Sequence, residues 1–225
     1  METVISENDL YENYSNIAHV DLYYFNLGRI KKMKKGLSAK DLINVGIYTA
    51  IYLVLFFVIG MMNAIPILYP AIYLLIPIVT GIPFMLFLTK VEKFGMVTIM
   101  SIIIGVFWYF MGYTWLALVG YIPFGIISDL VMKSGGFKSF KKNVIGFWLF
   151  SCGMIGCQMP MWVMADTYME GVKQQMGEQY ALALAKYMPS WMGIAAFGII
   201  FIGSVIGANL GRKMLKKHFE RAGII

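Results

Sequence analysis

Aromatic, amide and sulfur side chains gather where the apolar segments of this chain end. The candidates for binding a ligand are Asn63, Trp108, Tyr109, Tyr113, Trp115, Gln158, Met159, Trp162, Asp166 and Trp191. Flat aromatic walls with a few polar groups suit a planar or ring-containing molecule. The methionines of 154–164 can line such a pocket or act as soft ligands to a metal or haem iron, and lining is the commoner role. An interfacial belt of Trp and Tyr is the competing explanation for the aromatic residues.

The residue patterns of common catalytic sites are missing from the sequence. Both histidines, His19 and His218, fall outside the apolar segments, so a Ser–His protease within a membrane would lack its base. No HExxH zinc motif and no phosphate-binding GxxxxGKS or GxxxxGKT loop occurs. Cys152 and Cys157 are five residues apart, about 140° around a helix, and form no CxxC site. We therefore predict a protein that is not an enzyme and holds no metal or cofactor of its own.

The elements that must position these residues are long apolar runs. Of the 225 residues, 59% are hydrophobic and 14% are charged, whereas a soluble domain has about 45–50% and about 25%. Runs near the roughly 20 residues of a membrane-spanning helix cover 42–62, 67–88, 94–111, 113–132, 144–165 and 191–210. The runs are continuous rather than alternating, which excludes a membrane β-barrel. We expect an all-α integral membrane protein with six transmembrane helices.

The basic residues predict the orientation of these helices. Seventeen of the nineteen Lys and Arg residues fall in the two tails, in the link between the second and third runs and in the link between the fourth and fifth runs. With six crossings, these four segments share one face of the membrane. The other face has Lys173 and Lys186. Lys and Arg are retained on the cytoplasmic side, so both termini should be cytoplasmic. The net charge of +7 is then a topology signal, and nucleic acid is not an expected partner.

Two segments lie outside the runs. Residues 1–36 are predicted to be a mobile cytoplasmic tail ahead of a six-helix domain over 37–225, with a start at Met33 as an alternative. The outer link 166–190 contains a helix-forming stretch, 170–187, with Tyr180, Leu184 and Tyr187 on one face. Such an amphipathic helix would lie on the outer membrane surface or cap a pocket, and the sequence does not choose between the two.

Small residues recur at helix-packing spacing in the first and last runs. Gly46 and Ala50 form one pair, and Gly203, Gly207 and Gly211 form a double GxxxG. Small side chains let membrane helices approach closely. The contact can be made within this bundle or with the helices of another subunit, and both interpretations stay open.

Two stretches carry a family resemblance, SAKDLINVGIYTAIYLV at 38–54 and GIPFMLFLTKVEKFGMVTIM at 81–100. They resemble the Trep_Strep family of small integral membrane proteins, over essentially 38 to the C-terminus. Members are commonly labelled MptD-family substrate-binding (S) components of energy-coupling factor (ECF) transporters. The resemblance implies a bacterial plasma membrane and a six-helix protein that captures a micronutrient outside and delivers it inside by toppling. Its implied partners are a transmembrane scaffold (T) component and two cytoplasmic ATPases, which bind ATP and Mg.

The resemblance also implies a coupling site. In ECF transporters an AxxxA motif of the first helix contacts the scaffold, and the matching positions here are Gly46 and Ala50, with Gly in place of the first Ala. Ligand sites of such proteins lie in the outer half, where the aromatic cluster falls. The cargo classes weighed are vitamin-like heteroaromatics, pterin-type rings and a tetrapyrrole such as haem.

The rival hypothesis is a free-standing secondary carrier or a membrane-embedded enzyme. No acid or histidine lies in the middle of a run, which argues against a self-sufficient proton-driven carrier. A sodium site built from carbonyl and hydroxyl oxygens stays open. Co-purification with a scaffold and ATPases separates the two hypotheses.

Overall fold

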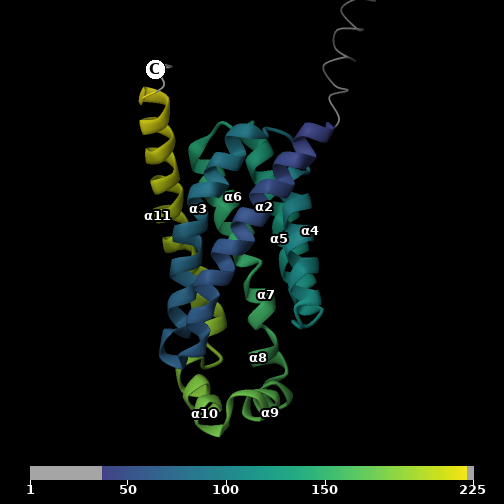
Figure 1. Cartoon of the computed structure of the whole chain (residues 1–225), viewed down its shortest axis with the longest axis vertical. Helices are drawn as coiled ribbons and strands as arrows, with labels where there is room; N and C mark the ends of the chain where they lie inside the picture. Colours follow the sequence, from purple (N-terminus) through teal and green to yellow (C-terminus); the bar gives the residue numbers. More distant parts are fainter. Residues whose placement is uncertain (1–36, 222–225) are drawn as a thin grey trace, which may run out of the picture. The chain divides into compact units, whose positions relative to one another are not determined.

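The computed structural model describes residues 37–221 of the chain, and the predicted tail 1–36 and the alternative start at Met33 lie outside them. The chain divides into two units, 1–38 and 39–225, and the second carries the fold. Residues 37–221 are helical with connecting turns and contain no strand. The elements are α2 (Ala39–Gly60), η1 (Met61–Ala64), η2 (Pro66–Ala71), α3 (Ile72–Lys90), α4 (Met96–Phe110), α5 (Leu116–Ser134), α6 (Phe140–Cys152), α7 (Ile155–Gln158), α8 (Pro160–Val163), α9 (Ala165–Met176), α10 (Glu178–Tyr187) and α11 (Met192–Arg221) (Figure 1).

Four helical segments in the described part are long and apolar enough to cross a membrane. They are Ala39–Ala64, Pro66–Lys90, Leu116–Ser134 and Met192–Lys216. The apolar helix α4 has 15 residues and is about 22 Å long, shorter than the roughly 30 Å of a bilayer core. The run 144–165 is divided among three helices. An all-helical membrane protein is thus confirmed, and the expectation of six crossings stays a prediction.

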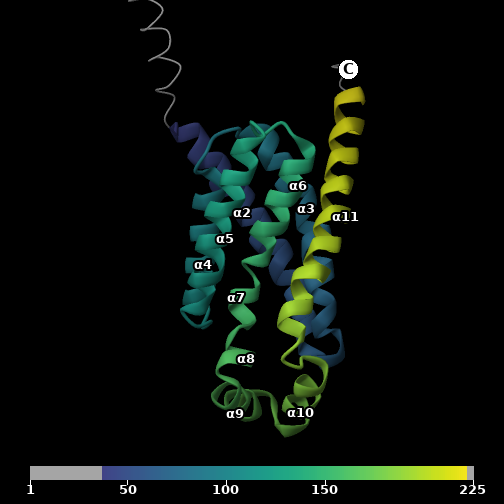
Figure 2. The same cartoon turned by 180° about the vertical axis from the view of Figure 1, so that it is seen from behind.

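The break in the run 144–165 has a local cause. The backbone N–H groups of Gly153 and Met154 donate to the carbonyls three residues back, which tightens the chain at the end of α6. Pro160 lacks an N–H to continue a helix beyond α7. A Cβ on Gly156 would lie 2.5 Å from the Leu116 carbonyl oxygen, so glycine is needed where α7 passes α5. The result is a chain of short helices leading toward α9 (Figure 2).

Glycines hold α3 and α11 in close backbone contact. A Cβ on Gly81 would lie 2.5 Å from the carbonyl carbon of Gly207. Gly203 likewise faces the Leu74 carbonyl, and Gly211 faces the side chain of Met85. The double GxxxG of the last run therefore packs against α3 within this chain. This agrees with the interpretation that it makes a contact within the bundle and not with another subunit.

The Gly46–Ala50 pair of α2 faces away from the rest of the bundle. A Cβ on Gly46 would meet nothing within 4 Å, and Ala50 is exposed. Neighbouring apolar residues of α2 are exposed as well, among them Ile43 at 61%, Val54 at 62% and Phe57 at 53%. Internal packing does not explain this pair, so α2 presents a smooth apolar face to its surroundings.

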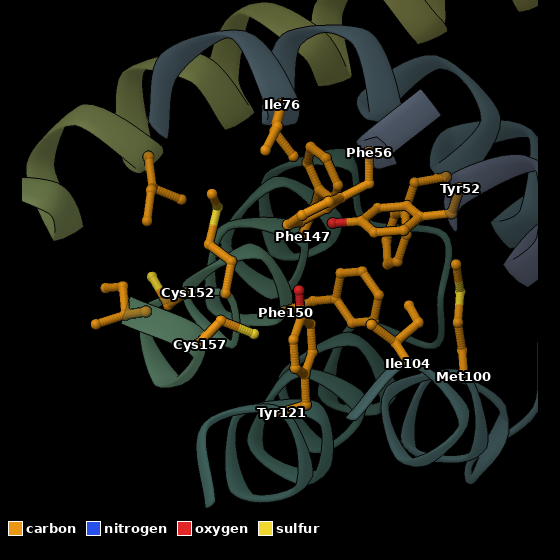
Figure 3. Packing of buried hydrophobic residues seen from close by; sticks show 14 of the residues in the cluster. Tyr52, Phe56, Ile76, Met100, Ile104, Tyr121, Phe147, Phe150, Cys152 and Cys157 are labelled. Carbon is orange, nitrogen blue, oxygen red and sulfur yellow. The ribbon is translucent and has the colours of Figure 1, made fainter. Parts of the chain in front are cut away.

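Aromatic rings in tilted and edge-on contact form the centre of the bundle. Phe84 of α3 lies between Phe147 and Phe150 of α6, with ring centroids 4.7 and 4.8 Å apart, and Tyr52 of α2 meets Phe150 edge-on at 5.3 Å. Figure 3 shows Tyr52 and Phe56 close to these phenylalanines. Close-packed rings of this kind leave little freedom to rearrange, so they fix the helices around the candidate site.

A buried carboxylate supports the start of α4. The Oδ2 atom of Asp129, on α5, accepts hydrogen bonds from the backbone N–H groups of Gly95 and Thr98 at 2.7 and 3.1 Å and from the Thr98 hydroxyl at 2.9 Å. These are the N–H groups that a helix leaves unpaired at its N-terminus, where negative charge is favoured.

We expect Asp129→Ala to lower the free energy of unfolding by about 2 kcal/mol, because charge-assisted bonds to a helix start are lost. The loss would be measured by thermal unfolding of the purified chain in detergent. Glu170→Ala, at an exposed carboxylate beyond the first turn of α9, is the matched control and should leave the midpoint nearly unchanged. Equal midpoints for both variants would contradict the capping role.

Candidate functional site

A cavity opens where α2, η1, α3, α4 and α7 meet, and we call it the inner cavity. Its volume is about 140 Å³. Its lining residues are Phe56, Phe57, Gly60, Met61, Asn63, Ile72, Ile76, Trp108, Tyr113, Cys157 and Gln158. The fold thus brings Asn63, Trp108, Tyr113 and Gln158 together from separate elements, although they are up to 95 positions apart in the sequence (158 − 63).

Trp108 is the central wall of the inner cavity. Its ring lies 4.9 Å from the Phe56 ring and 5.1 Å from the Tyr113 ring, which it meets edge-on. The side chain is almost fully buried, although it stands near the end of α4. A wall of this kind offers aromatic faces and edges to a flat ligand.

Two side-chain amides of the inner cavity have an oxygen with nothing to bind. Asn63 Oδ1 and Gln158 Oε1 are both buried, and neither has a hydrogen-bond partner among the described residues. Gln158 as a whole is 2% exposed. A buried acceptor without a partner destabilises a fold by about 1–3 kcal/mol. Both groups belong to residues that line one cavity, which makes this cavity the candidate for binding a ligand.

A second hollow, the outer cavity, lies beside the first and has a volume of about 370 Å³. It is lined by Met111, Gly112, Tyr113, Thr114, Cys157, Pro160, Thr167, Tyr168, Gly171, Val172 and Gln175. The two cavities share Tyr113 and Cys157, so these side chains separate one from the other. Thr114 Oγ1 is a further buried oxygen without a partner among the described residues.

The other six predicted ligand residues lie outside both linings. Tyr109, Trp115 and Trp191 are 47, 59 and 63% exposed, as residues of an interfacial belt would be. Met159 and Asp166 are exposed as well. Trp162 donates from Nε1 to the Met188 carbonyl at 3.3 Å and packs against Gly193. Their role in ligand binding stays a prediction.

The comparison with known families bears on the whole second unit. The profile of a family described as a hypothetical bacterial integral membrane protein, Trep_Strep, matches residues 39–221. The chain belongs to the Trep_Strep family. Searches of curated proteins and of solved structures find no significant match. The family and the apolar helices together place this chain in a bacterial membrane.

In this Trep_Strep chain, helices α9 and α10 lie beside the cavities. The sequence predicts one helix over 170–187, and the structure has two, because Gly177 adopts a positive φ of 89° between them. Residues of α9 line the outer cavity, and α10 packs against η2.

The Tyr180 hydroxyl of α10 donates to the Asn63 carbonyl oxygen at 2.5 Å. Burial raises the pKa of Tyr180, so this phenol stays protonated as a donor. Helix α9 thus forms a wall of the outer cavity, and α10 is joined to η1, which carries the inner-cavity residue Asn63. This arrangement fits a lid, which stays a hypothesis.

Sequence reasoning missed the α2 and α3 side of the Trep_Strep cavity. Phe56 and Phe57 stand near the end of α2, and Ile72 and Ile76 begin α3. The available signal was Asn63, which lies between the first two apolar runs. A candidate ligand residue at this position implies that the neighbouring ends of both helices lie near the site. The sequence singles out Cys157 only because it forms no CxxC site with Cys152, although Cys157 lines both cavities.

The side chains that most often hold metal ions are spread through the described part of the Trep_Strep chain. Residues 37–221 contain no group of three or more His, Cys, Asp or Glu side chains that could hold a metal ion. Cys152 and Cys157 are both buried and free.

Proposed function

We propose that this chain is the substrate-binding (S) component of an ECF-type importer. It captures a ring-containing micronutrient from outside the cell and delivers it inside, driven by a partner scaffold and two partner ATPases. The observation that carries this proposal is the pair of adjoining cavities, with unpartnered buried oxygens, at one end of a membrane-helix bundle. A chain built to bind, with no phosphate-binding loop of its own, needs an energy source on other subunits.

The proposed topology has six crossings with both termini in the cytoplasm. The α3–α4 link, the α5–α6 link and the C-terminal end of α11 lie at one end of the second unit, and α9 and α10 lie at the other (Figure 1). The first end carries Lys93, Lys138 and Arg212, as a cytoplasmic end would. The short α4 and the divided α6–α8 segment cross within the bundle, where irregular backbone is tolerated beside a binding cavity.

Lys141→Cys tests this topology, because Lys141 is exposed at the start of α6 and the two native cysteines are buried. In intact cells we expect no labelling of Lys141→Cys by a membrane-impermeant maleimide and full labelling after permeabilisation. Lys173→Cys on α9 is the matched control and should be labelled without permeabilisation. Labelling of Lys141→Cys in intact cells would reverse the orientation.

The exposed face of α2 supports a partner subunit in this proposal. Gly46 and Ala50 leave a shallow strip on which another helix can pack closely, and van der Waals contact along such strips drives helix association in lipid. The ligand cavities lie toward the far end of α2, near Phe56 and Gly60. Coupling and binding would then use separate parts of the same helix.

Affinity purification of the tagged full chain from its own membranes in mild detergent tests the function. We expect one further membrane protein and two ATPases to be recovered, with uptake that stops when ATP is depleted. Recovery of the chain alone, together with uptake that follows a sodium gradient instead of ATP, would replace the proposal with a free-standing secondary carrier.

A further inference from the structure

The size of the inner cavity restricts what can fill it. Its volume is about 140 Å³. An engineered protein cavity of about 150 Å³ binds one benzene molecule. The inner cavity therefore has room for about one six-membered ring, and any larger part of an occupant must lie outside it.

The linings of both cavities also restrict the charge of the occupant. No Asp, Glu, Lys, Arg or His is among the residues that line the inner or the outer cavity. A carboxylate, phosphate or ammonium group placed there would leave water without gaining an opposite charge, which is strongly unfavourable. The part of an occupant that these linings enclose should therefore be uncharged.

The unpartnered oxygens indicate where the occupant must carry donors. Asn63 of η1 and Gln158 of α7 line the inner cavity, and their side-chain oxygens, Oδ1 and Oε1, are buried without a partner among the described residues. In the outer cavity Thr114 Oγ1 has no partner among the described residues, and Thr167 and Gln175 add further polar groups. Hydroxyl groups, which both donate and accept, satisfy such a mixed lining.

We infer that the cargo is an uncharged molecule in two parts. A single planar ring bearing N–H or O–H donors occupies the inner cavity, between Trp108 and the two amides. A short hydroxylated substituent passes Tyr113 and lies in the outer cavity under α9. That this molecule is transported rests on the proposed function, whereas its chemical class rests on the two cavities.

Three related probes test the ring and charge requirements on the purified wild-type chain. Nicotinamide is an uncharged ring with an N–H donor, N,N-dimethylnicotinamide lacks the donor, and nicotinate carries a charge. We expect nicotinamide at millimolar concentration to raise the unfolding temperature and to quench tryptophan fluorescence, because it would pack on Trp108. The other two should do neither. Equal responses to all three probes, or a response to none, would overturn the inference.

Gln158→Met tests the amide without any ligand. Methionine has a similar length but no unpartnered acceptor, so the empty variant should unfold at the wild-type temperature or above it. Its response to nicotinamide should fall at least tenfold in affinity, because the donor of the ring loses its acceptor. Gln174→Met, at an exposed glutamine of α9, is the matched control and should keep wild-type affinity. A lower unfolding temperature for Gln158→Met would show that the amide supports the fold instead of a ligand.

Mass spectrometry of the molecule retained by the mildly purified chain separates this inference from the proposed function. A neutral ring compound with hydroxyl groups supports the inference whether or not ATPases are recovered. A retained tetrapyrrole, carboxylate or phosphate ester would overturn the inference, and recovery of the ATPases in that experiment would still support the importer.

Discussion

Gly207→Ala should strongly destabilise the membrane unit. A Cβ at this position would press on the Pro77 carbonyl oxygen and lie 2.8 Å from the Ile78 carbonyl oxygen, well inside normal contact distance. These are backbone atoms of α3, so the strain is relieved only if α3 and α11 separate along their glycine contact. We expect the free energy of unfolding to fall by about 3 kcal/mol or more, a large part of the stability of an ordinary domain. Yield in the membrane and the thermal midpoint in detergent measure the loss.

Gly198→Ala is the matched control, since Gly198 stands on the same helix and a Cβ there would meet nothing within 4 Å. This variant should fold as well as wild type or slightly better, because alanine favours a helix over glycine. A wild-type midpoint for Gly207→Ala would mean that α3 and α11 are not in contact at this point.

Ala50→Trp should stop uptake while leaving the isolated chain intact. Gly46 and Ala50 face outward, so a large ring can extend from the helix without touching the rest of the chain. In the proposed importer the same ring would hold the scaffold helix away and remove the close contact that joins the subunits. We expect recovery of the partner subunits and ATP-driven uptake to fall at least tenfold, with an unchanged thermal midpoint and an unchanged response to nicotinamide.

Ile202→Trp is the control for Ala50→Trp, because Ile202 is an exposed apolar residue on another helix, α11. It should retain both uptake and partner recovery. If Ala50→Trp lost ligand binding to the same extent as uptake, the α2 face would have no separate coupling role.

Much of the fold could be predicted because long apolar runs are a strong signal. Each of the four long apolar helices overlaps a run read directly from the sequence. The division of 144–165 could not be read in this way, because hydrophobicity stays high through Gly153 and Pro160 while the hydrogen-bond pattern changes. Likewise, Gly46 and Gly207 stand in the same small-residue pattern, and only the placement of α3 distinguishes the outward glycine from the inward one.

The candidate site was harder to predict than the fold. A buried Trp108 and an exposed Trp115 are seven positions apart and look alike in sequence, since both stand near the end of an apolar run. Which of them lines a cavity depends on how α2 and α4 approach each other. The amide pair is different, because Asn63 and Gln158 are unusual residues among apolar neighbours, and that contrast identified them in advance.

In the proposed importer, we expect the hydrogen bond between Tyr180 and Asn63 to affect how long a bound molecule stays. The backbone carbonyl of Asn63 is fastened to α10, and the side chain of the same residue faces the inner cavity. A molecule held by the Asn63 amide would steady the turn to which the lid is attached, and the lid would in turn hinder escape. The dissociation rate would then fall and the residence time would lengthen. Most differences in affinity between related complexes arise from the dissociation rate. A scarce nutrient caught in this way would remain in place while the protein diffuses in the membrane toward its energised partners.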